Sequence, residues 1–418
     1  MKVKKGLGIV LAAILMLGAV GCGNQTPANS LKEEGEGSQK ASIEFFQFKR
    51  EAVDTFNVLI EQFNEKYPDI EIKQNTVPDD TKVLQARAAT NDFPDIYQRW
   101  PSDAAYRNYV KNGFIMDVTN EAFIENAIPA IRKSFEFDGK IYGVPLSMNA
   151  SGVIYNKKIF EDAGVDIPTT WDAFIEVCET LKGKGITPIE LMLKDAWTIK
   201  TFQQELMGNL VTAEEFQKVI GGEAKLADSE GWKQLCEKTL KILEYGQPDA
   251  AGAGYDQGIQ EFANGKAAMM LQGIWAIPSI QKANAEIELG KFVLPAINNP
   301  DEVKLVSGID VGLSIGAKTK SPDACKKFVA FLTSKESAQQ YADMDKSISA
   351  IQGVKTNDAV LESLTPYFEK GKIFTWPEHF WPAGAGDEYG QLAQEFSAKK
   401  DIDEFTRRVD AMFEDIQK

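Results

Sequence analysis

Apolar residues recur along the chain with two different spacings, which predict strands and helices in alternation. Residues 43–48 (IEFFQF) form a short apolar run that is typical of a buried strand. The next segment carries apolar residues at helical spacing and ends at a proline: Val53, Phe56, Ile60, Phe63, Tyr67 and Pro68. A second strand begins over 70–72, and a third, over 94–97, follows a helix near 80–89. This order of elements predicts a βαβ unit with parallel strands.

The spacing changes in the middle of the chain. Residues 139–153 predict two short strands joined by 145–149, a segment that can carry the chain from one lobe to another. Helical spacing then dominates up to residue 285. Further elements are expected downstream: a strand over 306–316, helices that start near 321 and 333, and a helical tail over 389–416.

The N-terminus has the pattern of an export signal. Lysines stand among the first five residues, and Leu7–Val20 carries no charge. This run is shorter than the roughly 20 residues of a spanning helix. It ends in small residues before Cys22 and resembles the lipobox of bacterial lipoproteins, whose cysteine is diacylated and becomes the first mature residue. We expect a signal peptide over 1–21, a lipid on Cys22 and, because 22–41 is polar and rich in Gly, Ser and Glu, a flexible tether.

Size and charge narrow the classes of function. About 375 residues follow the tether, which is more than one hydrophobic core usually supports, so two lobes are expected. The formal net charge is −15, and loss of the signal would remove lysines but no acid. A chain this acidic is not expected to bind nucleic acid, which needs a basic surface.

Three cysteines follow Cys22: Cys178, Cys236 and Cys325. Each stands at core spacing in an expected helix, which favours buried thiols that act as small apolar side chains. A bridge between Cys178 and Cys236 stays open. The sequence has a single histidine, His379, and no metal-binding or cofactor motif, so neither a cysteine nucleophile nor a metal nor a cofactor is expected.

Five segments of the chain carry a resemblance to a known family when they are taken in order: 45–72 (FFQFKREA…), 93–119 (FPDIYQRW…), 138–174 (DGKIYGVPL…), 262–280 (FANGKAAMML…) and 311–342 (VGLSIGAKTK…). They resemble the extracellular solute-binding proteins of family 1, which serve carbohydrate importers of the ATP-binding-cassette (ABC) type. Each motif is weak alone, but five in order behind a lipoprotein signal are specific. Together they cover nearly the whole mature chain.

The resemblance implies an α/β fold of the two-lobed periplasmic-binding-protein type. Each lobe would be a mostly parallel sheet flanked by helices, and a hinge would join the lobes around a ligand cleft. Both lobes are discontinuous in this family. The first would hold 42–148 plus 307–347, and the second 149–306 plus 348–418.

A sugar site should combine aromatic rings, which cover the apolar faces of the sugar, with fixed polar side chains that bind its hydroxyls. The densest such cluster is 374–382 (FTWPEHFWP), which has neither helical nor strand spacing. We expect a loop that presents Trp376, Glu378, His379 and Trp381 to the ligand. The alternative is a loop whose rings fill the core of the second lobe, and we expect a mixture in which Trp376 and His379 face the cleft.

Strand ends supply further candidates. Ligands of open α/β sheets bind beyond the carboxyl ends of the strands. This rule selects Gln47, Phe48 and Lys49 after the first strand and Trp100 after the third.

Four other positions complete the predicted site. Asp310 interrupts an apolar strand, and a buried acid there needs partners, either a ligand hydroxyl or a structural network. Asn149, at the first expected crossing, has the same two alternatives. The resemblance adds Trp275, at an aromatic position that often faces the cleft in the family, and Trp197 is kept as a further contact.

These expectations predict the substrate-binding component of an ABC sugar importer, which captures an oligosaccharide and delivers it to the membrane permease. The FFQFKREA opening resembles binders of raffinose-type and isomaltose-type sugars, which favours an α-galactoside or α-glucoside. The protein would be a monomer, held by its lipid on the extracytoplasmic face of the membrane, with the importer's membrane subunits as partners.

Other classes of function stay as alternatives. A secreted glycan-acting enzyme would need two carboxylates roughly 5–10 Å apart, for which Glu378 and Asp310 could be imagined. The remaining alternatives are a binder of a non-sugar solute and a scaffold lipoprotein without a small ligand.

Overall fold

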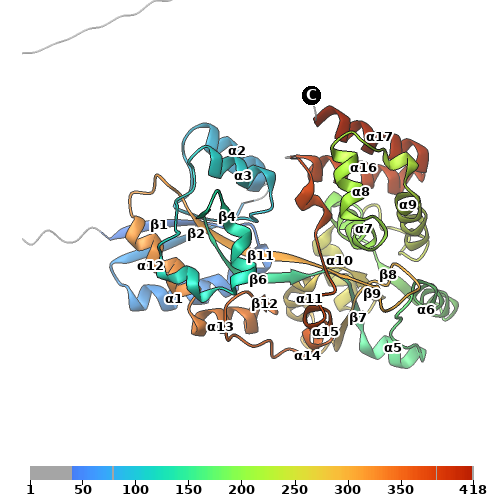
Figure 1. The fold of residues 1–418 in the computed structure, drawn as a ribbon. Coiled ribbons are helices and arrows are strands. Elements are labelled where there is room, and N and C mark those ends of the chain that lie inside the picture. The colour runs from blue at the N-terminus through green and yellow to red at the C-terminus, as the bar shows by residue number, and fades with distance from the viewer. Residues whose placement is uncertain (1–39, 78–79, 383, 417–418) are drawn as a thin grey trace, which may run out of the picture. The chain divides into compact units, whose positions relative to one another are not determined.

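Two β-sheets, each covered by helices, organise the chain (Figure 1). The computed structural model describes residues 40–77, 80–382 and 384–416. The larger sheet has seven strands in the order β12-β6-β11-β3-β1-β2, with β13 beside β11. The smaller sheet has four, in the order β10-β7-β9-β8. The fold is therefore α/β with two lobes, one around each sheet.

The strands of the larger sheet are β1 (Ala41–Phe46), β2 (Ile70–Asn75), β3 (Ile96–Gln98), β6 (Val144–Ala150), β11 (Leu305–Ile315), β12 (Ile348–Ser349) and β13 (Ile373–Thr375). Those of the smaller sheet are β7 (Val153–Asn156), β8 (Thr187–Glu190), β9 (Ala267–Leu271) and β10 (Leu289–Phe292). A separate pair is formed by β4 (Glu136–Phe137) and β5 (Lys140–Ile141).

The helices near the larger sheet are α1 (Val53–Lys66), α2 (Asp80–Ala89), α3 (Ala104–Lys111), α4 (Pro129–Arg132), α12 (Pro322–Leu332) and α13 (Lys335–Asp345). Those of the other lobe are α5 (Lys157–Ala163), α6 (Trp171–Gly183), α7 (Ala196–Leu210), α8 (Ala213–Ile220), α9 (Glu230–Leu243), α10 (Tyr255–Ala263), α11 (Ile277–Ala283), α14 (Ala359–Glu362), α15 (Thr365–Glu369), α16 (Ala385–Lys399) and α17 (Ile402–Ile416). The 3-10 helices next to the site are η1 (Arg50–Ala52), η5 (Ile274–Ala276) and η6 (Pro377–Phe380).

Both faces of the larger sheet are buried, as β1 shows. The ring of Phe45 lies 5.0 Å from that of Phe56 on α1 and 5.7 Å from that of Phe328 on α12. The neighbouring Phe46 points to the opposite face, where it packs in a cluster with residues of α2 and α3. Because both faces are covered at its carboxyl end, β1 finishes with two consecutive buried phenylalanines, whereas Ser42 and Glu44 alternate with Ile43 nearer its start.

The smaller sheet is covered on both faces in the same way. Val153 and Tyr155 of β7 belong to a core shared with α6, α7, α9, α16 and α17. Ile154, between them, belongs to another core shared with α10 and α11. Two independently packed sheets give each lobe its own hydrophobic core.

The sheets are mixed, so the expectation of mostly parallel sheets is wrong. Parallel pairs join β1 to β2 and β3, β8 to β9, and β11 to β13. The pairs of β11 with β3 and β6, of β6 with β12, and of β7 with β9 and β10 are antiparallel. The resemblance implied mostly parallel strands in both lobes. The N-terminal βαβ unit is parallel, but β6 and β11 run against each other through the middle of the fold.

The expected joint over 145–149 is also wrong, because β6 runs through it without a break. Pro145 is tolerated because it pairs with Gly312, where the register of β11 shifts. The chain turns instead at Gly152, whose φ is 141° and whose Cβ, if present, would lie 2.5 Å from the carbonyl oxygen of Phe292. Since β6 and β11 continue through 148–149 and 306–307, the predicted lobe boundaries stay a prediction.

The three cysteines Cys178, Cys236 and Cys325 are free and buried, so the bridge left open between Cys178 and Cys236 is not formed.

Among the helices of the described chain, none is long and apolar enough to cross a membrane. The predicted signal peptide, Cys22 and the tether up to residue 39 lie outside the described residues.

Candidate functional site: aromatic and polar side chains around β6 and β11

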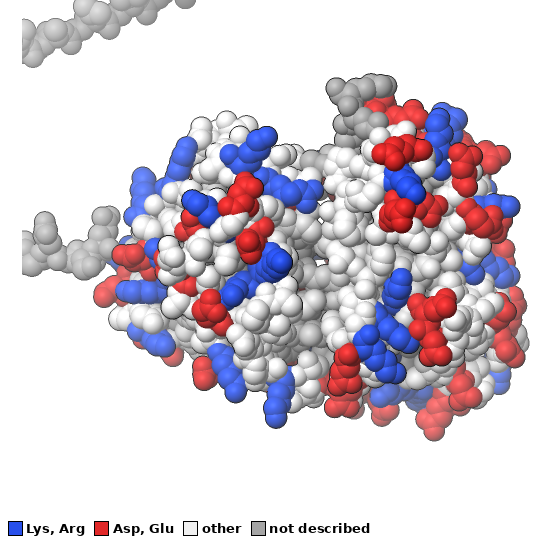
Figure 2. All heavy atoms as spheres, viewed as in Figure 1, with Lys and Arg blue, Asp and Glu red and all other residues white. Residues whose placement is uncertain are grey.

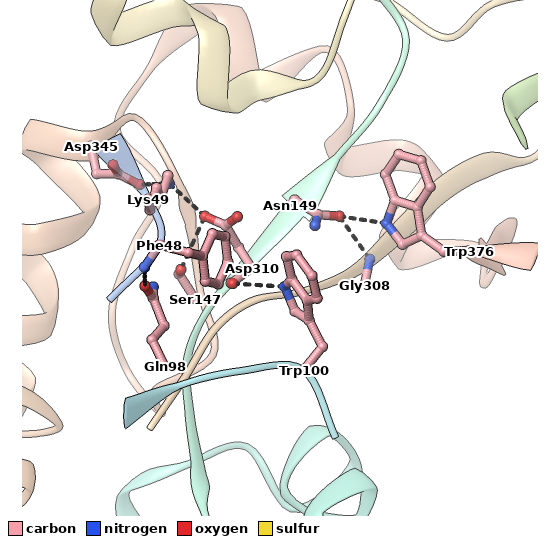
Figure 3. A network of polar contacts seen from close by, with 10 residues as sticks. All are labelled: Phe48, Lys49, Gln98, Trp100, Ser147, Asn149, Gly308, Asp310, Asp345 and Trp376. Carbon is pink, nitrogen blue, oxygen red and sulfur yellow. Dashed lines mark hydrogen bonds and ion pairs between the residues drawn. The ribbon is translucent and has the colours of Figure 1, made fainter. Parts of the chain in front are cut away.

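Two aromatic rings lie together just beyond the ends of β1 and β3 (Figure 3). The ring centroids of Phe48 and Trp100 are 4.6 Å apart, and both side chains are partly exposed. The backbone N–H of Phe48 donates to Oε1 of Gln98 (3.3 Å), and Nε1 of Trp100 donates to the main-chain oxygen of Asp310 (3.0 Å). The rule that places ligand contacts beyond strand ends therefore selects two rings that the structure brings together.

Gln47 lies inside the lobe instead. Its side chain is fully buried, and its Nε2 donates to Oε1 of Gln74 (2.9 Å) and to Oγ1 of Thr76 (2.7 Å). These bonds tie β1 to β2, so we do not carry Gln47 into the proposed site.

Lys49 and Asp310 bind each other. The Lys49 ammonium lies 2.6 Å from Oδ2 of Asp310 and 2.5 Å from Oδ2 of Asp345, and Oγ of Ser147 is 3.5 Å from the same Asp310 oxygen. Burial lowers the pKa of Lys49, but the two carboxylates outweigh it and hold that pKa well above its ordinary value. Of the two alternatives for Asp310, the structure shows the structural network.

Asn149 connects β6 to the C-terminal aromatic segment. Its Oδ1 accepts hydrogen bonds from Nε1 of Trp376 (2.9 Å) and from the backbone N–H of Gly308 (3.0 Å). A Cβ on Gly308 would lie 2.8 Å from Cδ1 of Trp376, so only glycine lets the indole approach β11 this closely. The half-buried ring of Trp275 lies 6.0 Å from that of Trp376. Trp275 and Trp376 form a second aromatic group, and Figure 3 shows Trp376 beside Asn149 and Gly308, farther along β11 from the Phe48–Trp100 pair.

Most of the segment 374–382 belongs to the short elements β13 (Ile373–Thr375) and η6 (Pro377–Phe380), with Trp376 between them, so the expectation of a loop throughout is wrong. Oε2 of Glu378 lies 2.5 Å from the ammonium of Lys200 on α7. Burial raises the pKa of Glu378, but Lys200 outweighs it, and the net shift is downward. The neighbouring His379 is half-buried, and burial lowers its pKa to about 4, so its imidazole is neutral near pH 7.

The remaining two predicted tryptophans, Trp381 and Trp197, differ in how far their side chains are exposed. Trp381 is 2% exposed and packs against Phe216, Tyr389 and Phe413 in the core of the second lobe. The structure therefore places it where the core alternative put it, and we leave it out of the proposed site. Trp197 is 36% exposed at the start of α7, where its ring lies 4.8 Å from that of Tyr255.

Sequence reasoning missed three residues of this region: Asp345, Lys200 and Tyr255. Asp345 ends α13 and Lys200 lies in the middle of α7, so each becomes a partner only through tertiary packing. Tyr255 did leave a signal, because an aromatic residue follows a glycine at the first position of α10, beside a cap formed by Asp195.

The arrangement can bind a neutral molecule that has apolar faces and hydroxyl groups. Three of its rings, those of Phe48, Trp100 and Trp275, are partly exposed, and hydrogen bonds fix the orientation of the Asn149 and Gln204 amides. On the face drawn in Figure 2, charged side chains of both signs cover the outer parts of the lobes, and the band between the lobes is mostly uncharged. Within the described ranges, no group of His, Cys, Asp and Glu side chains could hold a metal ion.

Sequence comparison connects the chain to sugar-binding proteins. The chain is 30% identical over 382 residues to the multiple sugar-binding protein of Streptococcus mutans, a match that covers 90% of this chain and 89% of that protein. It is 25% identical over 360 residues to the melibiose/raffinose/stachyose-binding protein MelE of Bacillus subtilis, with 82% of each chain covered.

Comparison with solved structures agrees with the sequence comparison. The solute-binding protein RafE in complex with raffinose superimposes with a TM-score of 0.82 at 26% identity, over 90% of this chain and 100% of RafE. The apo form of RafE from Streptococcus pneumoniae gives 0.74 at the same identity, over 91% and 99%. The family model of the bacterial extracellular solute-binding proteins matches residues 50–339. The chain is therefore a member of the bacterial extracellular solute-binding proteins.

Proposed function

We propose that this protein is the substrate-binding component of an ABC importer and captures an oligosaccharide between its two lobes. The observation that carries the proposal is the presence of two aromatic groups near the strands β6 and β11: Phe48–Trp100, whose rings are both partly exposed, and the partly exposed Trp275 beside the buried Trp376. Aromatic faces suit the C–H faces of sugar rings, and fixed amides suit their hydroxyls. Two such groups suit a ligand with more than one ring.

The proposed ligand class is an α-galactoside of the raffinose type, with α-glucosides as the second choice. Support comes from the relatives, since RafE is solved with raffinose and MelE binds melibiose, raffinose and stachyose. In the proposed site, Trp100, Trp275, Trp376 and His379 contact the sugar, and Trp197 adds a ring at its edge that is tilted by 57° against that of Tyr255.

The protein binds its ligand without chemical turnover in this proposal. A glycoside hydrolase needs a carboxylic acid whose pKa is raised so that it can donate a proton. Glu378 has the opposite shift because Lys200 lowers its pKa, and Asp310 is held in an ion pair with Lys49. Glu378 therefore lacks the raised pKa of a general acid, and the Asp310 carboxylate is occupied by Lys49, which supports binding without turnover.

The N-terminal segment completes the proposal. A diacylated Cys22 would hold the protein on the extracytoplasmic face of the membrane, and residues 22–41 would let the folded lobes reach the importer's membrane subunits as a monomer.

A thermal-shift screen of residues 40–418 tests the ligand class. Raffinose, stachyose, isomaltotriose, galactose and glucose are each added at several concentrations. A ligand at 100 times its dissociation constant stabilises the folded protein by about 2.7 kcal/mol. We expect the largest shifts with raffinose and stachyose, and no shift with any oligosaccharide would contradict the proposal.

A further inference from the structure

Three chain segments meet at one buried ammonium, that of Lys49 (Figure 3). Lys49 follows β1, Asp310 lies in the middle of β11, and Asp345 ends α13 just before β12. Lys49 is 3% exposed, and its nitrogen lies 2.6 Å from Asp310 and 2.5 Å from Asp345. A lysine this buried is rare unless it is paired, and here it has two carboxylate partners from distant parts of the chain.

The cluster is also connected to the aromatic pair of the proposed site. Phe48 immediately precedes Lys49, and its ring packs on that of Trp100. The indole of Trp100 donates to the main-chain oxygen of Asp310, the residue whose carboxylate binds Lys49. Lys49 and Asp310 therefore hold both rings at once, one through the adjacent backbone and one through a hydrogen bond.

We propose that Lys49, Asp310 and Asp345 are positioning residues for sugar binding: their buried ion cluster fixes the end of β1 against β11 and α13 and so holds the Phe48–Trp100 ring pair in the orientation that receives the ligand. This inference rests on the proposed function. It replaces the expectation that Lys49 and Asp310 contact the sugar, because their side chains are buried and bind each other.

The charge balance of the cluster makes it sensitive to pH. One ammonium faces two carboxylates, and a proton on either carboxylate replaces one of the two ion pairs of Lys49 by a weaker contact with a neutral group. Burial raises the pKa of Asp345 to about 6, against the opposing effect of Lys49. The other titratable groups that face the cluster are Glu51 on η1, Tyr341 on α13 and Tyr255 on α10.

Protonation of Asp345 removes one of the two charges that hold Lys49. The cluster should then hold the Phe48 and Trp100 rings less firmly, so the affinity for the sugar should fall as the pH is lowered from 7 to 5. Asp345→Asn places a neutral side chain of nearly the same shape at this position at every pH. This variant should bind the sugar at pH 7 as weakly as the acid form of the wild type does, and its affinity should stay constant down to pH 5.

The experiment is a raffinose titration by calorimetry of the full-length protein between pH 5 and 8. The variants are Asp345→Asn and Lys49→Met, with Asp343→Asn, an exposed carboxylate on the same helix, as the matched control. We expect affinity losses on the order of tenfold at pH 7 for Asp345→Asn and more for Lys49→Met, a wild-type loss toward pH 5, and an Asp343→Asn curve identical to that of the wild type.

The outcomes separate the two proposals. If the wild type does not bind raffinose or stachyose at any pH, the proposed function fails and this inference fails with it. If the wild type binds but Asp345→Asn binds equally well and keeps the same pH profile, only the positioning role is overturned. A Lys49→Met variant that does not fold leaves the decision to Asp345→Asn, whose unfolding temperature is measured beside its affinity.

Discussion

The hydrogen bonds of Asn149 show how single residues define the proposed site. One amide oxygen serves both the indole of Trp376 and the backbone of β11, so the ring is held by a strand that also belongs to the sheet core. The glycine at 308 is needed because any side chain there would occupy the place of the indole. A ring fixed in this way loses little conformational freedom when a ligand covers it.

Replacing Trp376 by Phe tests this arrangement. Trp376→Phe keeps an aromatic face but removes the N–H that binds Asn149, so the ring should lose its fixed orientation. We expect raffinose affinity to fall by about tenfold, which corresponds to the loss of roughly one hydrogen bond to a buried acceptor. Trp171→Phe, at the start of α6, is the matched control and should leave the affinity unchanged. Equal affinities for wild type and Trp376→Phe, measured by calorimetry, would contradict the role of Trp376.

The single histidine allows a second test at this scale. Burial lowers the pKa of His379 from an ordinary 6.5 to about 4. Because the folded state favours neutral imidazole, the stabilisation is complete above pH 6.5 and is lost as the pH falls from there toward 4. The loss should be no more than about 3 kcal/mol.

The imidazole signal in proton NMR is unambiguous because no other histidine exists in the chain. It should titrate with a midpoint near pH 4 and shift when raffinose is added at pH 7. A midpoint at 6.5 or above would contradict the burial of His379, and the absence of a ligand-induced shift would remove it from the proposed site. In His379→Asn, the free energy of unfolding should fall less steeply over the same pH range.

At the scale of elements, the sequence predicts what local spacing determines. The helix α1 and the strands β1 and β2 follow directly from apolar spacing and from Pro68, and the same holds for α2. The continuous β6 could not be predicted, because Pro145 is tolerated only through a register shift in β11 that lies far away in sequence. The short β13 depends on its pairing with the start of β11, so its own residues carry no strand pattern.

The residues of the candidate site also differ in whether the local sequence could predict them. Phe48 and Trp100 could be found by the strand-end rule, and Trp376 by its aromatic neighbourhood. The partners that hold the rings and charges, Asp345 and Lys200, become visible only when distant segments are packed together.

In the C-terminal aromatic segment, 374–382, we expect one tryptophan to contribute to stability and another to ligand binding. Trp381 is buried in the core formed with α16 and α17, whereas Trp376, although only 6% exposed, lies outside that core and belongs to the proposed site. Trp381→Ala should lower the free energy of unfolding by about 3–5 kcal/mol, as expected for a large side chain removed from a core. The folded fraction should bind raffinose with wild-type affinity. A lower affinity with unchanged urea unfolding would place Trp381 at the ligand instead.

At the scale of the whole molecule, two sheets with separate cores make up the lobes, and the long strands β6 and β11 belong to the larger sheet. Such lobes can move as units while each core stays packed. A ligand that contacts both lobes shifts the equilibrium toward the closed form only by its extra affinity for that form.

Small-angle X-ray scattering tests this closure. Saturating raffinose should reduce the radius of gyration of residues 40–418, because the lobes approach each other around the sugar. Galactose at the same concentration serves as the control and should leave the curve unchanged. Superimposable curves with and without raffinose would show that binding occurs without lobe closure.

The central claim is that the protein binds an oligosaccharide and releases it unchanged. Isothermal calorimetry of residues 40–418 with raffinose, followed by chromatography of the recovered sugar, tests it most directly. We predict saturable binding of one raffinose per chain, and intact raffinose after prolonged incubation. Absence of heat with raffinose and stachyose, or the appearance of galactose and sucrose in the recovered sample, would contradict the claim.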